Sequence, residues 1–130
     1  MATLKTASIE TAKLLRKRRF NEPTTAYYDP EGHFVELPEG SAPICWNNPT
    51  HDRGMRHQSY AAPTLALAQQ WLREKKRFDV LVEREYFLGK IGKYYARIYR
   101  LSDGAMSETP QYRSYEKALE AGIVRALRAM

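Results

Sequence analysis

The residues with the most reactive side chains lie in one irregular segment, 38–61, which contains Cys45, His51, Asp52 and His57. Cysteine and histidine are ligands that zinc prefers, but zinc sites of this kind usually combine a closely spaced cysteine pair with a closely spaced histidine pair. The chain has a single cysteine, so a cysteine pair cannot form. We therefore predict no metal site and keep Cys45, His51 and His57 only as weak candidates.

The same segment offers a cysteine nucleophile and a histidine base. Such a pair must meet within hydrogen-bond distance, usually with a third group that orients the histidine. Trp46 beside Cys45 favours a small side chain packed against an aromatic ring. The sequence also has none of the Gly-rich phosphate-binding, hydrolase or metalloprotease motifs. It therefore favours a non-enzymatic protein, with no catalytic residue and no cofactor.

A second group of residues combines aromatic rings with cations in the strand-like segment 93–100. Tyr95, Arg97 and Tyr99 share one face by strand alternation. Three more cations flank them: Lys90, Lys93 and Arg100. Phosphates bind cations while bases stack on aromatic rings, so we predict that these six residues bind nucleic acid.

Two alternatives stay open for this segment. The first is a solvated strand face, whose cations are partly cancelled by Glu83 and Glu85 on the neighbouring strand. The second is a protein interface, because the nine tyrosines and two tryptophans are residues that dominate such contacts. The partner would be another protein or a second copy of this chain, and a second copy would pair through sheet edges or the C-terminal helix.

The net charge of +6 is unevenly distributed. Residues 1–20 carry six basic side chains and one acidic side chain. Residues 21–60 carry two basic and six acidic side chains, and residues 61–130 carry thirteen basic and eight acidic side chains. The basic character is therefore no argument for a uniform polyanion-binding surface. The chain has neither the long apolar stretch of a membrane helix nor that of a secretory signal, so we expect a cytoplasmic protein without a membrane partner.

The first half of the chain predicts one helix and one hairpin. Ser8 is a typical N-cap for a helix that begins at Ile9. Segments 24–28 and 33–37 are rich in β-branched and aromatic residues and flank a Pro/Gly turn, which is typical of a hairpin. The segment 38–61 that follows has no periodicity, and we expect a long loop there.

The second half predicts a helix, a three-stranded meander and a final helix. Pro63 suits the first turn of a helix that runs to about Lys76. Strands are expected over 78–86 and 93–101, joined by a turn at residues 89–92, with a third strand that ends near Tyr112. Ser114 caps the final helix, in which Gly122 would allow close approach to a strand.

The chain length of 130 residues predicts a single domain. The expected fold is α+β: a small antiparallel sheet, made of a hairpin plus a three-stranded meander, with about three helices packed on one face. Three strands followed by a helix is also the element order of the arm-type DNA-binding modules of phage integrases, which is a likeness of topology only.

Several phrases of the sequence resemble a family of small uncharacterised proteins encoded by gut-bacterial prophages and mobile elements. The resemblance lies in Ala62-Pro63-Thr64 with the following Gln69–Glu74, in Ser114–Gly122, and in the early residues 10–14 and 20–22. Segment 38–61 falls outside it. The resemblance implies a bacterial cytoplasm and a mobile-element context, in which a protein partner would be a host protein or a phage protein. It carries no known site residues.

Overall fold

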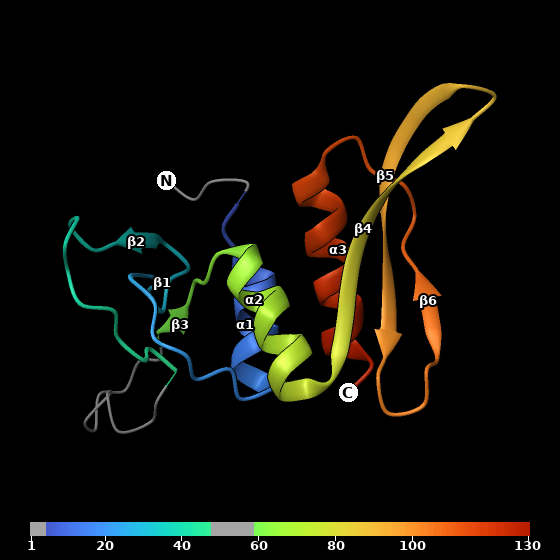
Figure 1. Ribbon diagram of the computed structural model, residues 1–130. Coiled ribbons are helices and arrows are strands. Elements are labelled where there is room, and N and C mark those ends of the chain that lie inside the picture. Colours follow the sequence, from blue (N-terminus) through green and yellow to red (C-terminus); the bar gives the residue numbers. More distant parts are fainter. Residues whose placement is uncertain (1–4, 48–58) are drawn as a thin grey trace. The chain divides into compact units, whose positions relative to one another are not determined.

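The protein is described by a computed structural model that covers residues 5–47 and 59–130. The chain divides into two compact units, Met1–Thr64 and Leu65–Met130. Helices and two antiparallel three-stranded sheets form them, which confirms the predicted α+β class (Figure 1). The single domain expected from the length stays a prediction. No helix in the described ranges is long and apolar enough to cross a membrane.

The first unit begins with α1 (Ile9–Lys17), which starts where the sequence predicts. The Ser8 hydroxyl accepts a hydrogen bond from the Thr11 amide and so satisfies one of the free amides of the first turn. Ala12 and Leu15 are fully buried, and Phe20 is buried just after the helix. Arg16 and Lys17 lie in the last turn, where positive charge suits the exposed carbonyls.

The sheet of this unit has the strand order β2-β1-β3, with β1 at Ala26–Tyr28, β2 at Phe34–Glu36 and β3 at Tyr60–Ala61. The β1–β2 hairpin is as predicted, but two expectations were wrong. The hairpin does not share a sheet with the meander, and residues 60–61 are not part of a loop. The free edge of β1 needs hydrogen-bond partners, and Tyr60 and Ala61 supply them by pairing with Tyr28 and Tyr27.

The second unit begins with α2 (Leu65–Trp71), which continues as one π-helical turn, η2 (Leu72–Lys76). The extent of the predicted helix is therefore confirmed, but the sequence did not predict that its last turn is π-helical. The sheet that follows has the order β4-β5-β6, with β4 at Phe78–Phe87, β5 at Lys90–Arg100 and β6 at Met106–Glu108. The third predicted strand thus ends at Glu108, although Tyr112 still forms a bridge with Tyr94.

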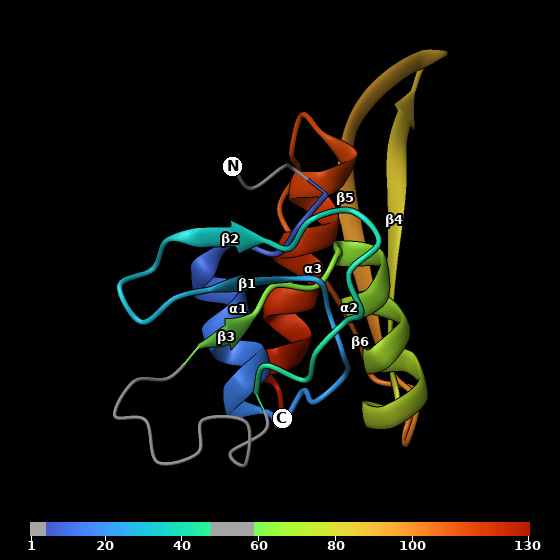
Figure 2. The ribbon, with the colours of Figure 1, turned by 90° about the vertical axis from the view of Figure 1, so that its left-hand side faces the viewer.

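The last helix, α3 (Tyr115–Arg128), packs against β4 and β5. Figure 2 shows it lying along the sheet. Its apolar stripe is buried, with the residues Ala118, Leu119, Gly122, Ile123, Ala126 and Leu127. A Cβ atom on Gly122 would lie only 2.6 Å from Val80 Cγ1 and 2.7 Å from Ala96 Cβ, which confirms the expected close approach.

Replacing Gly122 with alanine tests this contact. At an open helix position, the change would stabilise the protein by up to about 1 kcal/mol, because alanine is the better helix former. Here we expect a loss of about 1–3 kcal/mol, because the added methyl group overpacks the interface. The free energy of unfolding in urea measures the effect, and a more stable variant would contradict the close approach.

Candidate nucleic-acid interface

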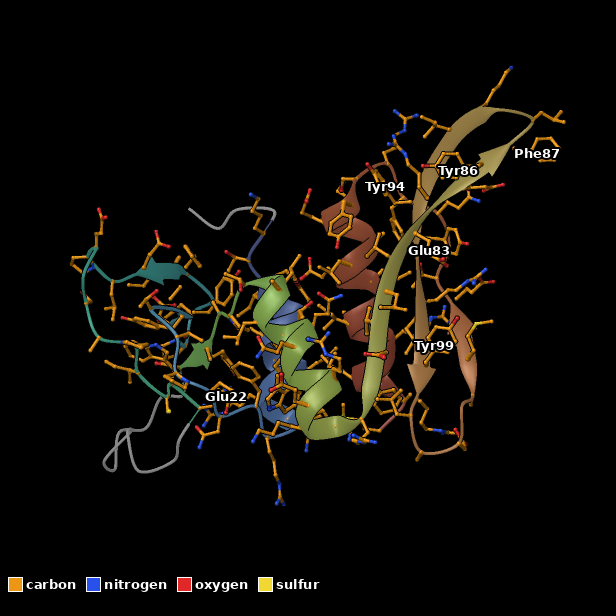
Figure 3. The ribbon with its side chains drawn as sticks, viewed as in Figure 1. Glu22, Glu83, Tyr86, Phe87, Tyr94 and Tyr99 are labelled. Atoms are coloured by element: carbon orange, nitrogen blue, oxygen red, sulfur yellow. The ribbon has the colours of Figure 1, made fainter. Side chains whose placement is uncertain are left out.

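The face of β5 that points away from α3 carries the predicted aromatic and basic side chains. Ala96 and Ile98 are buried under α3, with exposed fractions of 0% and 4%. Strand alternation therefore places Tyr95, Arg97 and Tyr99 on the opposite face, where all three are half-buried. In Figure 3, Tyr99 and Glu83 lie on one side of the sheet and Tyr94 lies on the side of α3.

Arg97 lies between two carboxylates from the flanking strands. Its Nε atom is 2.9 Å from Glu108 Oε2 and 2.9 Å from Glu83 Oε2. The hydrogen bond to Glu108 is the largest of the interactions that raise the pKa of Arg97 above its ordinary value. The charge of Arg97 is thus already neutralised within the sheet, as the solvated-face alternative requires.

Arg100 is also paired, and it lies on the other face. Its Nε and Nη2 atoms donate to the two carboxylate oxygens of Asp103, at 3.0 Å and 2.6 Å. This hydrogen bonding, together with the amide of Ala105, lowers the pKa of Asp103 to about 2. Arg100 pairs with the buried Phe78 across the sheet, on the side of α3. The structure therefore separates Arg100 from Tyr95, Arg97 and Tyr99.

A β-bulge places Lys90 on the face opposite α3. Between the pairs Arg84–Tyr94 and Tyr86–Ile91, β4 has one residue and β5 has two, so the alternation of β5 shifts by one. Lys90 then pairs with Phe87 on the face of Tyr95. Gly92 makes the bulge possible, because a Cβ atom there would lie 3.0 Å from the carbonyl oxygen of Glu85.

Beyond Tyr94 the sheet narrows to a two-stranded ribbon, residues 85–93, which we call the arm. β6 pairs only with residues 97–99 of β5, and the last bridge to β5 is at Tyr94. At a strand rise of about 3.3 Å per residue, the arm extends about 13 Å past the Arg84–Tyr94 pair. Figures 1 and 2 show the arm continuing past the N-terminal end of α3.

The base of the arm is anchored on both strands. The Arg84 guanidinium lies 4.5 Å from the Tyr94 ring centre, and the Tyr94 ring meets Tyr115 of α3 edge to face at 6.0 Å. On the face of the sheet that points away from α3, the Gln111 side-chain amide donates a hydrogen bond to the Glu85 carboxylate. These contacts hold the arm in a defined direction and give the charged groups at its base, Arg84 and Glu85, partners within the fold.

The tip of the arm is apolar and exposed. Large hydrophobic side chains with exposed fractions of 60–86% gather there: Tyr86, Phe87, Leu88 and Ile91. Figure 3 shows Tyr86 and Phe87 at the far end of the hairpin. Lys90 and Lys93 are exposed beside them, and neither forms an ion pair with any residue that the structure describes. Of the six predicted residues, these two carry the accessible charge.

The sequence reasoning missed this tip because it expected the turn at residues 89–92. The turn is instead the two-residue step Leu88-Gly89, with φ angles of 50° and 75°, and Gly92 lies within β5. The sequence did contain a signal for an apolar tip, namely the run Tyr86-Phe87-Leu88 directly before Gly89. Hairpin turns normally carry polar residues, so an apolar run at a turn is unusual.

The metal and catalytic candidates gain no support. Cys45 is half-buried and free, whereas His51 and His57 lie outside the described residues. The Trp46 ring stacks on Tyr27, with 4.0 Å between ring centres. The Trp46 indole nitrogen also donates to the Thr24 carbonyl, and this holds the ring over β1.

One cluster with ligand-type side chains was not predicted. Donor atoms of Asp29, Glu31 and His33 lie within 4.8 Å of one another in the β1–β2 turn. The Asp29 carboxylate accepts hydrogen bonds from the backbone amides of Glu31 and His33, and the His33 amide is the main reason why the pKa of Asp29 is lowered. We interpret this cluster as a turn held by the aspartate side chain.

Comparison with protein-family models, with curated proteins and with solved structures finds no match to this chain. The functional argument therefore depends on the chemistry of the arm and the sheet.

The Arg100–Asp103 pair can be tested by titration. Replacing Arg100 with glutamine should raise the pKa of Asp103 from about 2 towards its ordinary value of 3.8. The pair favours the folded state above pH 3.8, and this contribution disappears as the pH falls through about 2, where the carboxylate becomes protonated. The carboxyl carbon shift of Asp103 in NMR spectra measures the pKa.

The matched control is Lys90→Gln, which should leave the pKa of Asp103 unchanged. An ordinary pKa for Asp103 in the unaltered protein would show that the pair is absent in solution.

Proposed function

We propose that this protein is a non-enzymatic binding module that contacts double-stranded DNA with the arm, and that Lys90 and Lys93 bind phosphates. One observation carries the proposal. These two lysines are exposed on a projecting ribbon without an ion-pair partner in the described part of the chain, whereas Arg97 and Arg100 are held by carboxylates. The proposal keeps the nucleic-acid prediction and moves its centre from the sheet face to the arm.

The shape of the arm supports duplex DNA as the ligand. The major groove of B-DNA admits a two-stranded β-ribbon, and known ribbon readers enter either groove. The major groove of A-form RNA is deep and narrow, and side chains cannot read it. A two-stranded ribbon therefore suits B-DNA better than double-stranded RNA.

The local charge supports the same ligand. Residues 84–93 contain three basic side chains and one acidic one. The acidic residue, Glu85, already accepts a hydrogen bond from Gln111, so its carboxylate is drawn to the base of the arm. Towards the tip the remaining charge is positive, as phosphate binding requires.

A protein partner is the second candidate, because the arm ends in exposed hydrophobic side chains. Patches of this kind are common at protein interfaces. The two candidates differ in their response to salt. Phosphate contacts release counterions and weaken steeply with salt, whereas an apolar interface does not.

We expect the Lys90→Gln/Lys93→Gln double variant to bind a short DNA duplex more weakly and with a smaller salt dependence. Each lost phosphate contact should reduce the slope of log K against log salt by about 1, so the double variant should lose about 2. Fluorescence anisotropy of a labelled duplex between about 50 and 200 mM salt measures both affinity and slope.

The matched control is the Arg97→Gln/Arg100→Gln double variant, which removes the same number of positive charges. It should keep the salt slope of the unaltered protein, because its cations are paired within the sheet. If this variant loses the slope and the lysine variant keeps it, the sheet face is the interface. Absence of DNA binding by the folded protein at low salt would overturn the proposal.

A further inference from the structure

Leu88 occupies a position that the fold does not explain. It is the first residue of the two-residue hairpin turn, with φ 50°, a region that asparagine, aspartate or glycine adopts far more readily than leucine. Its side chain is 86% exposed, so packing does not compensate for the unfavourable backbone. A strained and exposed apolar residue at the end of a projecting ribbon indicates a role in binding.

The neighbours of Leu88 extend the same apolar surface. Phe87 is 68% exposed and pairs across the ribbon with Lys90, while Tyr86 is 69% exposed and pairs with Ile91. One strand face at the tip thus pairs an aromatic ring with a cation, and the other is apolar. A ligand for this tip must offer flat apolar surfaces and negative charge side by side.

Opened base-pair steps of DNA have this combination. Phosphates give no apolar surface on which leucine or phenylalanine could pack, whereas the faces of unstacked bases do give one. DNA-bending proteins insert such side chains between base pairs. Unstacking has an energetic cost, which is smallest where the stack is already interrupted by a gap or a bulge.

On the basis of the proposed function, we infer that Leu88 and Phe87 form a wedge that inserts at an interrupted base step. The preferred substrate is therefore duplex DNA with a gap or bulge. Lys90, directly across from Phe87, then binds a phosphate beside the opened step, and Lys93 binds further along the backbone. This division of roles assigns substrate preference to the tip and general affinity to the lysines.

The test compares two DNA probes of the same sequence, a continuous duplex of about 20 base pairs and one with a gap of about two nucleotides. We expect the unaltered protein to bind the gapped probe at least about tenfold more tightly, because the unstacking cost has been removed. A fluorescent base analogue beside the gap should brighten or quench on binding, since a wedge changes its stacking.

The variant that separates the wedge from the fold is Leu88→Asn. Asparagine suits this turn, so the variant should be at least as stable as the unaltered protein to heat. It should lose most of the preference for the gapped probe, because only Phe87 of the wedge remains, while the lysines keep the general affinity. The matched variant Lys90→Gln/Lys93→Gln should weaken binding to both probes by the same factor and keep the preference for the gap.

Three results would overturn the inference. Equal binding of both probes by the unaltered protein would refute the wedge and leave the proposed function in place. A preference for the gap that Leu88→Asn leaves undiminished would refute the role of Leu88. Failure of the folded protein to bind either probe would refute the proposed function, and the wedge with it.

Discussion

The close packing of α3 on the sheet of the second unit determines what the rest of this unit can present to a ligand. At Gly122 the helix approaches Val80 and Ala96 so closely that no side chain fits between them. This contact decides which face of β4 and β5 is buried. It also places Tyr115 at the base of the arm, where its ring meets Tyr94. The direction of the arm therefore depends on how α3 is seated.

Charge pairing then divides the cations of the sheet into two groups. Arg97 and Arg100 are held by carboxylates from neighbouring strands or turns. Such exposed pairs add little stability, but they remove these cations from the attractive field of the surface. Lys90 and Lys93 form no ion pair with any residue that the structure describes and keep their charge available.

Local sequence patterns predicted the elements well. Ser8 and Ser114 mark the helix starts, because a hydroxyl that caps the first turn is a local requirement. Strand alternation correctly placed Tyr95, Arg97 and Tyr99 on one face of β5, because successive side chains of a strand point to opposite faces. The opposite face, which includes Ala96, is buried. A glycine in the apolar stripe of the last helix, Gly122, indicated close approach to a strand, and the structure shows this approach.

The features that the patterns missed depend on non-local pairing. Tyr60–Ala61 is too short to show a strand period, and it becomes a strand only because β1 has a free edge. The bulge at Gly92 depends on the register between two strands, and this register decides the face on which Lys90 lies. The pairing of Arg97 with Glu108 requires the position of β6. All six predicted site residues lie in β5 and are exposed or half-buried, although the sequence pattern placed Lys90 in a turn. Which of their cations are paired with carboxylates could not be read from the sequence.

Amide chemical shifts during a DNA titration give the most direct test of the central claim, that the arm and not the sheet face contacts DNA. The account predicts that the amide signals of Leu88, Lys90 and Lys93 move on addition of duplex DNA, while those of Arg97 and Arg100 stay in place. Shifts confined to residues 95–100, with the arm unchanged, would contradict it.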